Sequence, residues 1–424
     1  MIYIPLIFFS ILFFCIYKQR GFEISTFVVF LYVITSICCV LASTFFQNIV
    51  YTNVTLIPTI IYCLLVSISI IPLYQFNAKD IKLVINKNER TITVLTIMFF
   101  SGFVFTSIVY YNDILFRFSY QDWGELRNMI YKGDALEIHH LSGVLGLVER
   151  FFGFVNQASF LMFPVFFVSV CFLNKSRWFL LMCFLGTVSV VLTGILNVER
   201  SSAFKWFIML TLNLVLFWPL MKRETKRRVF PIISFVLIAI ALYFVSVTVS
   251  RFSETDRGTN GGFVTYAANP YLNFCDFYDN YNGGSSFSTK TLFPGFHTYV
   301  LKDYSGGVGF QQEMTLKSKK DCGTFYSFLG WFMLDLNQKG PFIFIIIYTL
   351  LFLIVLQNKT RFTISLYSLL CNYSLMVIPA YGCIAYNYMY GSSTYSVLFI
   401  LLLVKILESF NNKKNENKNC IRIS

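Results

Sequence analysis

The sequence of 424 residues has few charged side chains and almost no histidine. Asp, Glu, Lys and Arg make up 13% of the residues and three are His, whereas hydrophobic residues make up 56% and the mean hydropathy is +0.64. Soluble globular domains carry about twice that share of charge. This composition excludes an ordinary soluble domain and predicts a protein that is embedded in a membrane.

Alternation of apolar and polar residues is lacking too, which argues against a membrane β-barrel. Ile232 to Val249 and Phe342 to Leu356 are continuously apolar instead, as a lipid-facing helix requires. We therefore expect an all-α polytopic membrane protein with about 11 transmembrane helices. Met1 to Tyr17 lacks a basic start and a small-residue cleavage site, so we expect a first span there and no cleaved signal peptide. The expected spans are 4–17, 24–46, 54–74, 92–111, 154–173, 178–196, 203–220, 229–249, 341–356, 364–381 and 395–407.

Motifs for metal or redox chemistry are also missing. No Asp-x-Asp pair occurs, and the neighbouring His139 and His140 have no acidic or Cys partner at metal-ligand spacing. Most of the 11 cysteines fall inside apolar stretches, where they serve as small core residues. We expect no metal ion and no other cofactor. Cys275 and Cys322 lie in a polar region and could form a disulfide if that region faces an oxidising compartment.

Positive charge is concentrated in alternate connections between the spans. Almost all of the net charge of +13 lies on one side of the membrane, in the connections with Lys18 and Arg20, Lys79 to Arg90, Lys175 and Arg177, Lys222 to Arg228, Lys359 and Arg361, and in the tail from Lys405. By the positive-inside rule this side is cytoplasmic, with the N-terminus outside and the C-terminus inside. The basic excess thus sets membrane orientation, and we expect no nucleic-acid partner.

The predicted organisation follows from these spans. The first eight spans fill residues 1–249 and include an external interfacial segment at 112–153; a large external loop with a membrane-entering helix fills 250–339, the last three spans fill 340–410, and a cytoplasmic tail fills 411–424. A chain that is nearly all membrane keeps its polar chemistry outside the spans. We therefore expect function around the external segments.

Arginines at the external ends of two spans are the main candidates for chemistry. Arg200 lies in the short turn before the seventh span, and Arg251 follows the eighth span directly. A guanidinium group is a planar, two-pronged donor that suits the phosphate of a lipid-linked substrate. The alternatives are a pairing of Arg200 with Glu199 or a lipid headgroup. Arg257 is a weaker candidate for substrate binding, for which snorkelling to the interface or a pairing with Asp256 is favoured.

The pattern of apolar residues in the first external segment predicts a short interfacial helix. Leu126, Met129 and Ile130 share one helical face, and Arg127 lies at the border of that face. A structural role for this helix is favoured over direct chemistry. Arg127 remains a candidate for substrate binding.

The long external loop combines amides with aromatic rings, as a sugar-binding cleft requires. His297, Asp276 and Asp279 are its candidates for contact with sugars, and His297 has an alternative structural role. Farther along, a membrane-entering helix is expected to break near Asn337 and Gly340. Asp335 next to this break needs a cation or water, or an ion pair with Lys339 four residues on.

Several of these stretches, taken in their order, resemble the Wzy-type O-antigen and capsule repeat-unit polymerases. They are Trp123 to Arg127, the Thr-Gly then Arg-Ser-Ser turn from Thr193 to Ser202, Arg251 at the start of a large external loop, and Gly323 to Gly340, all among spans rich in Phe and Tyr. Two departures concern Asp335-Leu336-Asn337, where an Asp-Phe-Gly would be typical, and Glu199, where a small residue is usual.

The resemblance implies a glycosyltransferase of the bacterial inner membrane. It would transfer a growing glycan from undecaprenyl diphosphate onto the next lipid-linked repeat unit on the periplasmic side, with a chain-length regulator protein and membrane lipids as further partners. Arg200 and Arg251 would stabilise the departing diphosphate. The acceptor hydroxyl would need a base, for which Asp276, Asp279, Asp335 and His297 are candidates.

Three alternatives remain open. A lipid-glycan ligase related to the O-antigen ligases would use the same donor chemistry with another acceptor. A flippase or transporter for lipid-linked oligosaccharides would favour charges within many spans and short loops on both sides. A membrane acyltransferase would favour a His deep inside a span, whereas His139, His140 and His297 all lie in polar segments.

Overall fold

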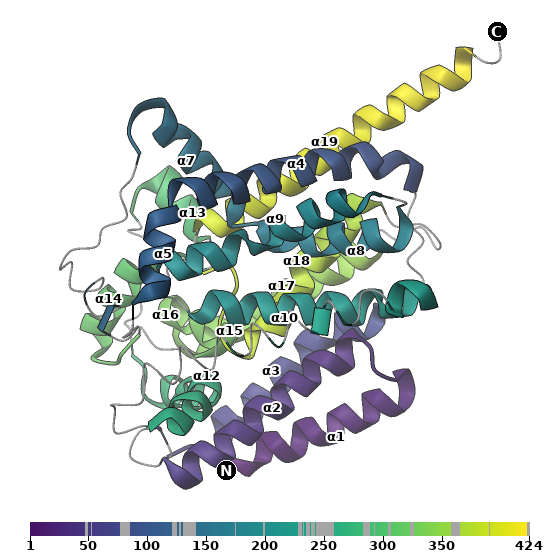
Figure 1. Ribbon diagram of the computed structural model, residues 1–424. Helices are drawn as coiled ribbons and strands as arrows, with labels where there is room; N and C mark the ends of the chain where they lie inside the picture. The colour runs from purple at the N-terminus through teal and green to yellow at the C-terminus, as the bar shows by residue number, and fades with distance from the viewer. Residues whose placement is uncertain are drawn as a thin grey trace. The chain divides into compact units, whose positions relative to one another are not determined.

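The chain folds into helices, as the computed structural model in Figure 1 shows. The structure describes residues 1–421 except 47–49, 52, 77–84, 121–124, 127–128, 130–140, 174, 198–199, 228–230, 232, 235–237, 239–241, 243–257, 283–288, 292, 304–306, 323–325, 358–364 and 390. This described part contains no β-strand, which agrees with the predicted all-α class.

Two compact units form, and each combines stretches that lie far apart in the sequence. Unit 1 comprises Met1–Phe76, Phe252–Gln357 and Leu375–Thr394, and unit 2 comprises Asn77–Arg251, Asn358–Ser374 and Tyr395–Ser424. The predicted segments followed the order of the chain, because hydropathy shows where a helix is but not which helix it packs against.

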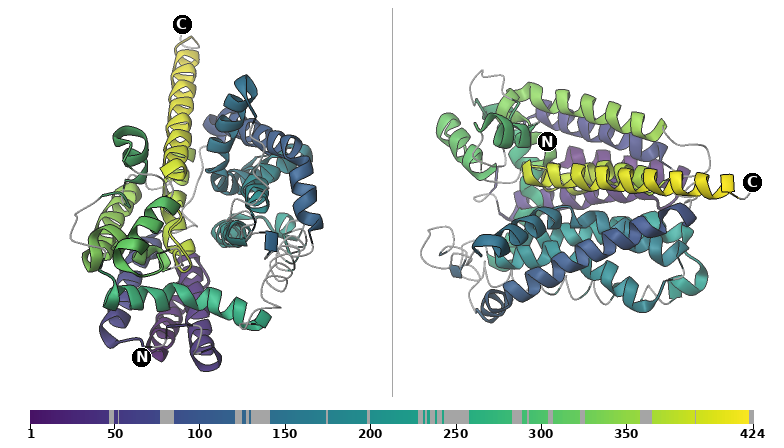
Figure 2. Two further views of the ribbon diagram at one scale, coloured as in Figure 1. Left: turned by 90° about the vertical axis from the view of Figure 1, so that its left-hand side faces the viewer. Right: turned by 90° about the horizontal axis from the view of Figure 1, so that it is seen from above.

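Unit 1 is built on a bundle of long apolar helices. They are α1 (Tyr3–Arg20), α2 (Ile24–Phe45), α3 (Leu56–Gln75) and α17 (Gly340–Gln357). The first three run up and down beside one another, and α17 packs along α3 (Figures 1 and 2). Aromatic rings fill the space between them: the centroid of the Phe9 ring lies 5.4 Å from that of Tyr32 and 6.3 Å from that of Tyr62. These contacts place the core of the bundle on the faces that α1, α2 and α3 share.

The described part of the predicted external loop is largely helical. Its longest element, α12 (Gly258–Asn280), lies crosswise to α2 and α3 and packs against both (Figures 1 and 2). Ala268 and Tyr271 are buried at helical spacing, and the Tyr271 ring centroid lies 5.0 Å from that of Tyr62. Shorter elements follow: α13 (Pro294–Phe296), the π-helical η4 (His297–Leu301), α14 (Gly307–Ser318), α15 (Ser327–Trp331), α16 (Met333–Leu336) and η5 (Asn337–Lys339).

Unit 2 is a second helical bundle. It contains α4 (Ile85–Val109), α5 (Tyr111–Ser119), α7 (Gly143–Asn156), η2 (Ser159–Leu161), α8 (Met162–Phe172), α9 (Arg177–Leu196), α10 (Arg200–Phe217), η3 (Trp218–Leu220), the first half of α18 (Leu366–Gly382) and most of α19 (Gly391–Ile421). Helices α4 and α9 approach closely, since a Cβ atom added at Gly186 would lie only 3.1 Å from Phe99 Cβ. One buried polar pair joins α10 to α18: the Asn213 amide donates to the Tyr373 hydroxyl at 2.7 Å.

Eight described helices are long and apolar enough to cross a membrane, and nine if one bent pair counts as a single span. The bent pair joins Gly143–Asn156 to Ser159–Phe172 at 53° and covers the fifth predicted span. Of the other predicted spans, most of 229–249 lies outside the described residues, and α18 has 17 residues, which is short for a spanning helix. The structure thus supports a multi-pass membrane protein but does not confirm a count of eleven.

Candidate functional site

Most of the arginines predicted to bind the diphosphate lie where the structure gives no placement. Arg127, Arg251 and Arg257 are outside the described residues. Arg200 is the first residue of α10, although its side chain is also outside the described part. The predicted proximity of Arg200 and Arg251 therefore remains a prediction.

One packing contact joins two of the predicted segments within unit 2. Leu126, which the sequence assigns to the apolar face of the first external segment, is fully buried against Ile195 at the end of α9. Ile114, Tyr120, Val191 and Leu192 pack around this pair. The contact holds Leu126 at the end of α9, five residues before Arg200 in the sequence, whereas Arg127 itself lies outside the described residues.

Sequence reasoning missed a buried arginine in unit 2. Arg117 in α5 is only 2% exposed, and α5 packs against α9. Burial lowers the pKa of the Arg117 guanidinium, whereas Asp113, one helical turn earlier, acts in the opposite direction. The spacing of Asp113 and Arg117 was the available signal, because an acidic and a basic residue at i and i+4 share one helix face.

A carboxylate connects α4 with α7 in the same unit. Glu149 accepts hydrogen bonds from the Tyr110 hydroxyl and, at 2.7 Å, from the backbone N–H of Leu141. This pairing fixes the start of α7 against the end of α4.

In unit 1, the carboxylate of Asp276 on α12 binds the ammonium group of a lysine and the amide of an asparagine. Lys320 Nζ lies 2.9 Å from Asp276 Oδ1 and 3.1 Å from Oδ2, and the Asn280 amide donates to Oδ1 at 2.7 Å. Asp279, one turn away from Asp276, accepts from the Thr55 hydroxyl at 2.9 Å. These contacts tie α12 to the start of α3 and to the segment that follows α14.

Asp335 is 5% exposed and holds a turn of the backbone in place. Its Oδ2 accepts from the backbone N–H of Thr291 at 2.5 Å, and Trp331 Nε1 donates to the Thr291 carbonyl at 3.3 Å. Asp335 Oδ1 is buried and has no partner in the described part of the chain. Both peptide groups of Thr291 are therefore held by side chains of α15 and α16.

The predicted break after Asp335 is confirmed, and the predicted ion pair is corrected. Asn337 has a φ of 49°, a left-handed conformation that ends α16, and α17 begins at Gly340. The i, i+4 spacing of Asp335 and Lys339 therefore does not place them on one helix face. Among the described residues, Asp335 forms its hydrogen bond with Thr291 and no ion pair with Lys339.

His297 connects two polar side chains that the sequence did not indicate. Its Nδ1 lies 2.9 Å from Asp303 Oδ1, and its Nε2 lies 2.9 Å from the Thr289 hydroxyl oxygen. The imidazole is buried, whereas the Asp303 side chain is 46% exposed and Thr289 is half-buried. Lys290 Nζ donates to the Asp303 carbonyl at 3.0 Å. Residues 289, 297 and 303 meet only because a short helical turn separates them, which sequence spacing alone does not show.

The disulfide considered for Cys275 and Cys322 is not present. Both residues are buried and both are free thiols. Cys275 lies in the face of α12 that packs on the bundle, and the Cys322 thiol lies 3.3 Å from the Lys320 carbonyl. Among the described residues no group of three His, Cys, Asp or Glu side chains could hold a metal ion.

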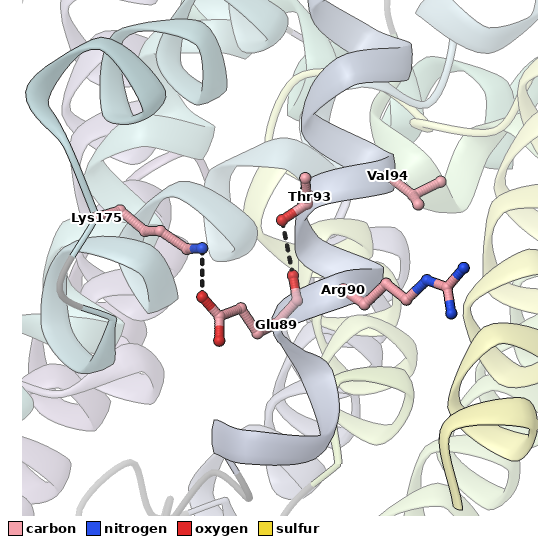
Figure 3. Close-up of a pocket in the computed structure, with 5 residues that line it drawn as sticks. All are labelled: Glu89, Arg90, Thr93, Val94 and Lys175. Carbon is pink, nitrogen blue, oxygen red and sulfur yellow. Dashed lines mark hydrogen bonds and ion pairs between the residues drawn. The ribbon is translucent and has the colours of Figure 1, made fainter. Parts of the chain in front are cut away.

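A shallow hollow of about 540 Å³ lies elsewhere, at the start of α4 in unit 2. Figure 3 shows its lining: Glu89 forms an ion pair with Lys175, and Arg90 points away from that pair. These residues belong to connections that the charge pattern predicts to be cytoplasmic. The hollow contains none of the residues predicted to bind substrate, so it is not a candidate for the glycan site.

Each unit therefore carries its own polar clusters: Asp276, Asp335 and His297 in unit 1, and Arg117 and Glu149 in unit 2. Comparison of the chain with protein-family models, with curated proteins and with solved structures finds no match.

Proposed function

We propose that this protein polymerises undecaprenyl-diphosphate-linked oligosaccharide repeat units into O-antigen or capsular polysaccharide, by glycosyl transfer on the periplasmic face of the bacterial inner membrane. The observation that supports this most is the burial of Leu126 against Ile195. It joins the two segments that carry Arg127 and Arg200, and these segments are among those that resemble repeat-unit polymerases.

The proposed chemistry depends on charge that develops in the leaving group. As the glycosidic bond to the lipid diphosphate breaks, negative charge grows on the diphosphate. Guanidinium groups held beforehand at the membrane boundary stabilise this charge more in the transition state than in the ground state. We assign this role to Arg200 and Arg251, with Arg127 and Arg257 as binding groups for the same substrate.

Substitution of the two arginines tests the proposal. In a strain whose chromosomal copy is deleted, Arg200→Ala and Arg251→Ala should each reduce long-chain glycan by about 100-fold or more, because one missing oxyanion donor costs that much in turnover. Arg177→Ala is the matched control, because Arg177 begins α9 at the predicted cytoplasmic end. The proposal fails if both variants give normal chain length at normal membrane abundance.

Deletion of the whole gene separates the proposal from its competitors. Loss of a polymerase leaves single repeat units attached to the lipid A core, loss of a ligase leaves none, and loss of a flippase traps the units on the cytoplasmic side. Gel analysis of lipopolysaccharide together with extraction of lipid-linked units distinguishes these three outcomes.

A further inference from the structure

We infer that His297, oriented by Asp303, takes the proton from the acceptor sugar hydroxyl, and that Thr289 occupies the Nε2 edge of His297 until this hydroxyl arrives. The inference rests on the proposed function and deepens it. It names one base out of four candidates, together with the residue that positions it.

Three of the four candidate bases already have other partners. Both oxygens of Asp276 contact Lys320, and Asp279 accepts from Thr55. Asp335 is buried and holds the Thr291 backbone. A carboxylate with such partners gains less by accepting a proton, because its charged form is already stabilised. His297 has partners on both ring nitrogens as well, but its Nε2 contacts a neutral hydroxyl that an acceptor hydroxyl can replace.

The partners of His297 determine which of its nitrogens can act as a base. An ionised carboxylate can only accept hydrogen bonds, so Nδ1 carries the proton that is donated to Asp303. In a neutral imidazole the other nitrogen then has a free lone pair, and Nε2 accepts from the Thr289 hydroxyl. A carboxylate, an imidazole and an alcohol thus lie in line, which is the arrangement that activates an alcohol oxygen in unrelated enzymes.

The contact with Thr289 indicates what kind of group can donate a hydrogen bond to Nε2 of His297. Its side chain is a secondary alcohol, the same functional group as most sugar hydroxyls. Its hydroxyl oxygen already lies at 2.9 Å from Nε2, within the reach that a general base requires. Thr289 is half-buried, whereas the imidazole of His297 is buried.

The segment that carries these residues is held firmly. Trp331 and Asp335 fix the backbone of Thr291, two residues after Thr289. At the other end, Lys302 adopts a φ of 56° and the Asp303 N–H donates to the His297 carbonyl at 3.1 Å. His297 also opens a π-helical turn, a local geometry that is frequent at functional sites. Thr289, His297 and Asp303 are therefore held in place before substrate binds.

The surroundings suit a substrate that is attached to lipid. Large apolar side chains are exposed on both sides of His297, namely Phe293, Phe296, Tyr299, Val300 and Leu301. In water these would be unfavourable, whereas at the boundary of a bilayer they lie against acyl chains and headgroups. A sugar tethered to undecaprenyl diphosphate is held at the same boundary.

The acceptor hydroxyl gives its proton to His297 Nε2, and its oxygen forms a bond to the anomeric carbon of the donor glycan. The bond from that carbon to the diphosphate oxygen breaks, and its electron pair leaves with undecaprenyl diphosphate. Asp303 stabilises the imidazolium that forms, which later returns the proton to solvent.

The experiment uses the full-length protein in lipid nanodiscs, with undecaprenyl-diphosphate-linked repeat units as donor and acceptor. His297→Gln should lower kcat by about 100-fold to 10,000-fold, the usual contribution of a general base. Asp303→Asn should lower kcat with little change in KM, since it acts through His297. Thr289→Val should lower kcat by far less than His297→Gln, because the acceptor hydroxyl takes the place of the Thr289 hydroxyl at Nε2. Glu313→Gln, in an exposed ion pair on α14, is the carboxylate control.

Several outcomes overturn the inference. It fails if His297→Gln or Asp303→Asn polymerises as fast as the wild type, or if Thr289→Val is as inactive as His297→Gln, because Thr289 would then be the deprotonated group. Since His297 is buried, His297→Gly with added imidazole provides a second test: restored activity supports the inference, and a folded variant that imidazole does not restore contradicts it. A wild-type protein that forms no polymer refutes the proposed function itself.

Discussion

At the scale of single residues, Asp335 shows how a buried carboxylate, which is costly to remove from water, can stabilise the backbone by accepting a hydrogen bond. A buried peptide N–H that lacks an acceptor destabilises a protein by about 1–3 kcal/mol. Asp335 Oδ2 supplies that acceptor for Thr291, while Oδ1 remains buried without a partner in the described chain. Asp335 therefore holds the backbone in place, and its contact with substrate stays a prediction.

Substitution of Asp335 should therefore reveal a loss of backbone support. Asp335→Ala removes the acceptor of the Thr291 N–H and should lower the free energy of unfolding by about 1–3 kcal/mol. Asp335→Asn keeps an oxygen at this place, so its stability should remain closer to that of the wild type. Thermal unfolding in detergent measures both. Equal stability of the two variants would contradict this role.

The two buried thiols of unit 1 should be insensitive to redox conditions. Burial raises the pKa of both Cys275 and Cys322, which keeps them protonated and unreactive. We expect a reducing agent to change neither the melting temperature nor the mobility on a denaturing gel. Faster mobility without reductant, abolished by Cys275→Ser, would show that a disulfide forms after all.

At this scale the sequence predicted residue types better than partners. The polar character of His297 and Asp276 was plain, and so was their position between apolar stretches. Their partners Asp303, Thr289 and Lys320 were not evident, because each contact depends on how short helices fold back on one another. Arg117 was missed because it lies in the external segment before the motif that starts at Trp123.

At the scale of secondary-structure elements, the turn between α16 and α17 depends on one glycine. A Cβ atom at Gly340 would lie 1.9 Å from the Phe332 carbonyl oxygen, a backbone atom that cannot move aside alone. The absence of a side chain lets α17 begin directly against the end of α15. Asn337 in a left-handed conformation supplies the change of direction.

Gly340→Ala should accordingly force α16 and α17 apart. We expect a loss of about 1–3 kcal/mol in the free energy of unfolding, as for other overpacked sites. Gly153→Ala is a matched control, because no atom lies within 4 Å of the added Cβ in α7 and alanine favours a helix by about 0.5–1 kcal/mol. Chemical denaturation of both variants measures the difference. A Gly340→Ala protein as stable as the control would refute the packing argument.

Hydropathy identified the long apolar helices well. Composition gave a wrong prediction of loop where a packed helix carries many polar residues. The ends of α2 and α9 fall within one residue of the predicted spans. Helix α12 was taken for loop because Asn, Gly and Asp lower its mean hydropathy. Its buried face, with Ala268, Leu272 and Cys275 at helical spacing, was present in the sequence but short of the length of a membrane span.

At the scale of the whole molecule, the charge pattern predicts one orientation in the membrane. Lys317 on α14 should face the periplasm and Lys222 after α10 the cytoplasm, and both are exposed. In intact cells with a permeable outer membrane, a membrane-impermeant maleimide should label Lys317→Cys and not Lys222→Cys. Lysed cells should label both. The reverse pattern would invert the topology and remove the basis of the proposed periplasmic reaction.

Unit 1 combines helices from the beginning of the chain with helices from near its end, and this affects how the protein is made. Its first three helices leave the ribosome early, but the Tyr32 hydroxyl donates to the carbonyl of Pro379, 347 residues farther along the chain. Until that residue is translated and inserted, the early helices have no complete set of neighbours and must wait in the lipid. A ribosome that stops before Pro379 therefore releases an unfinished bundle, which the cell's membrane proteases are expected to degrade.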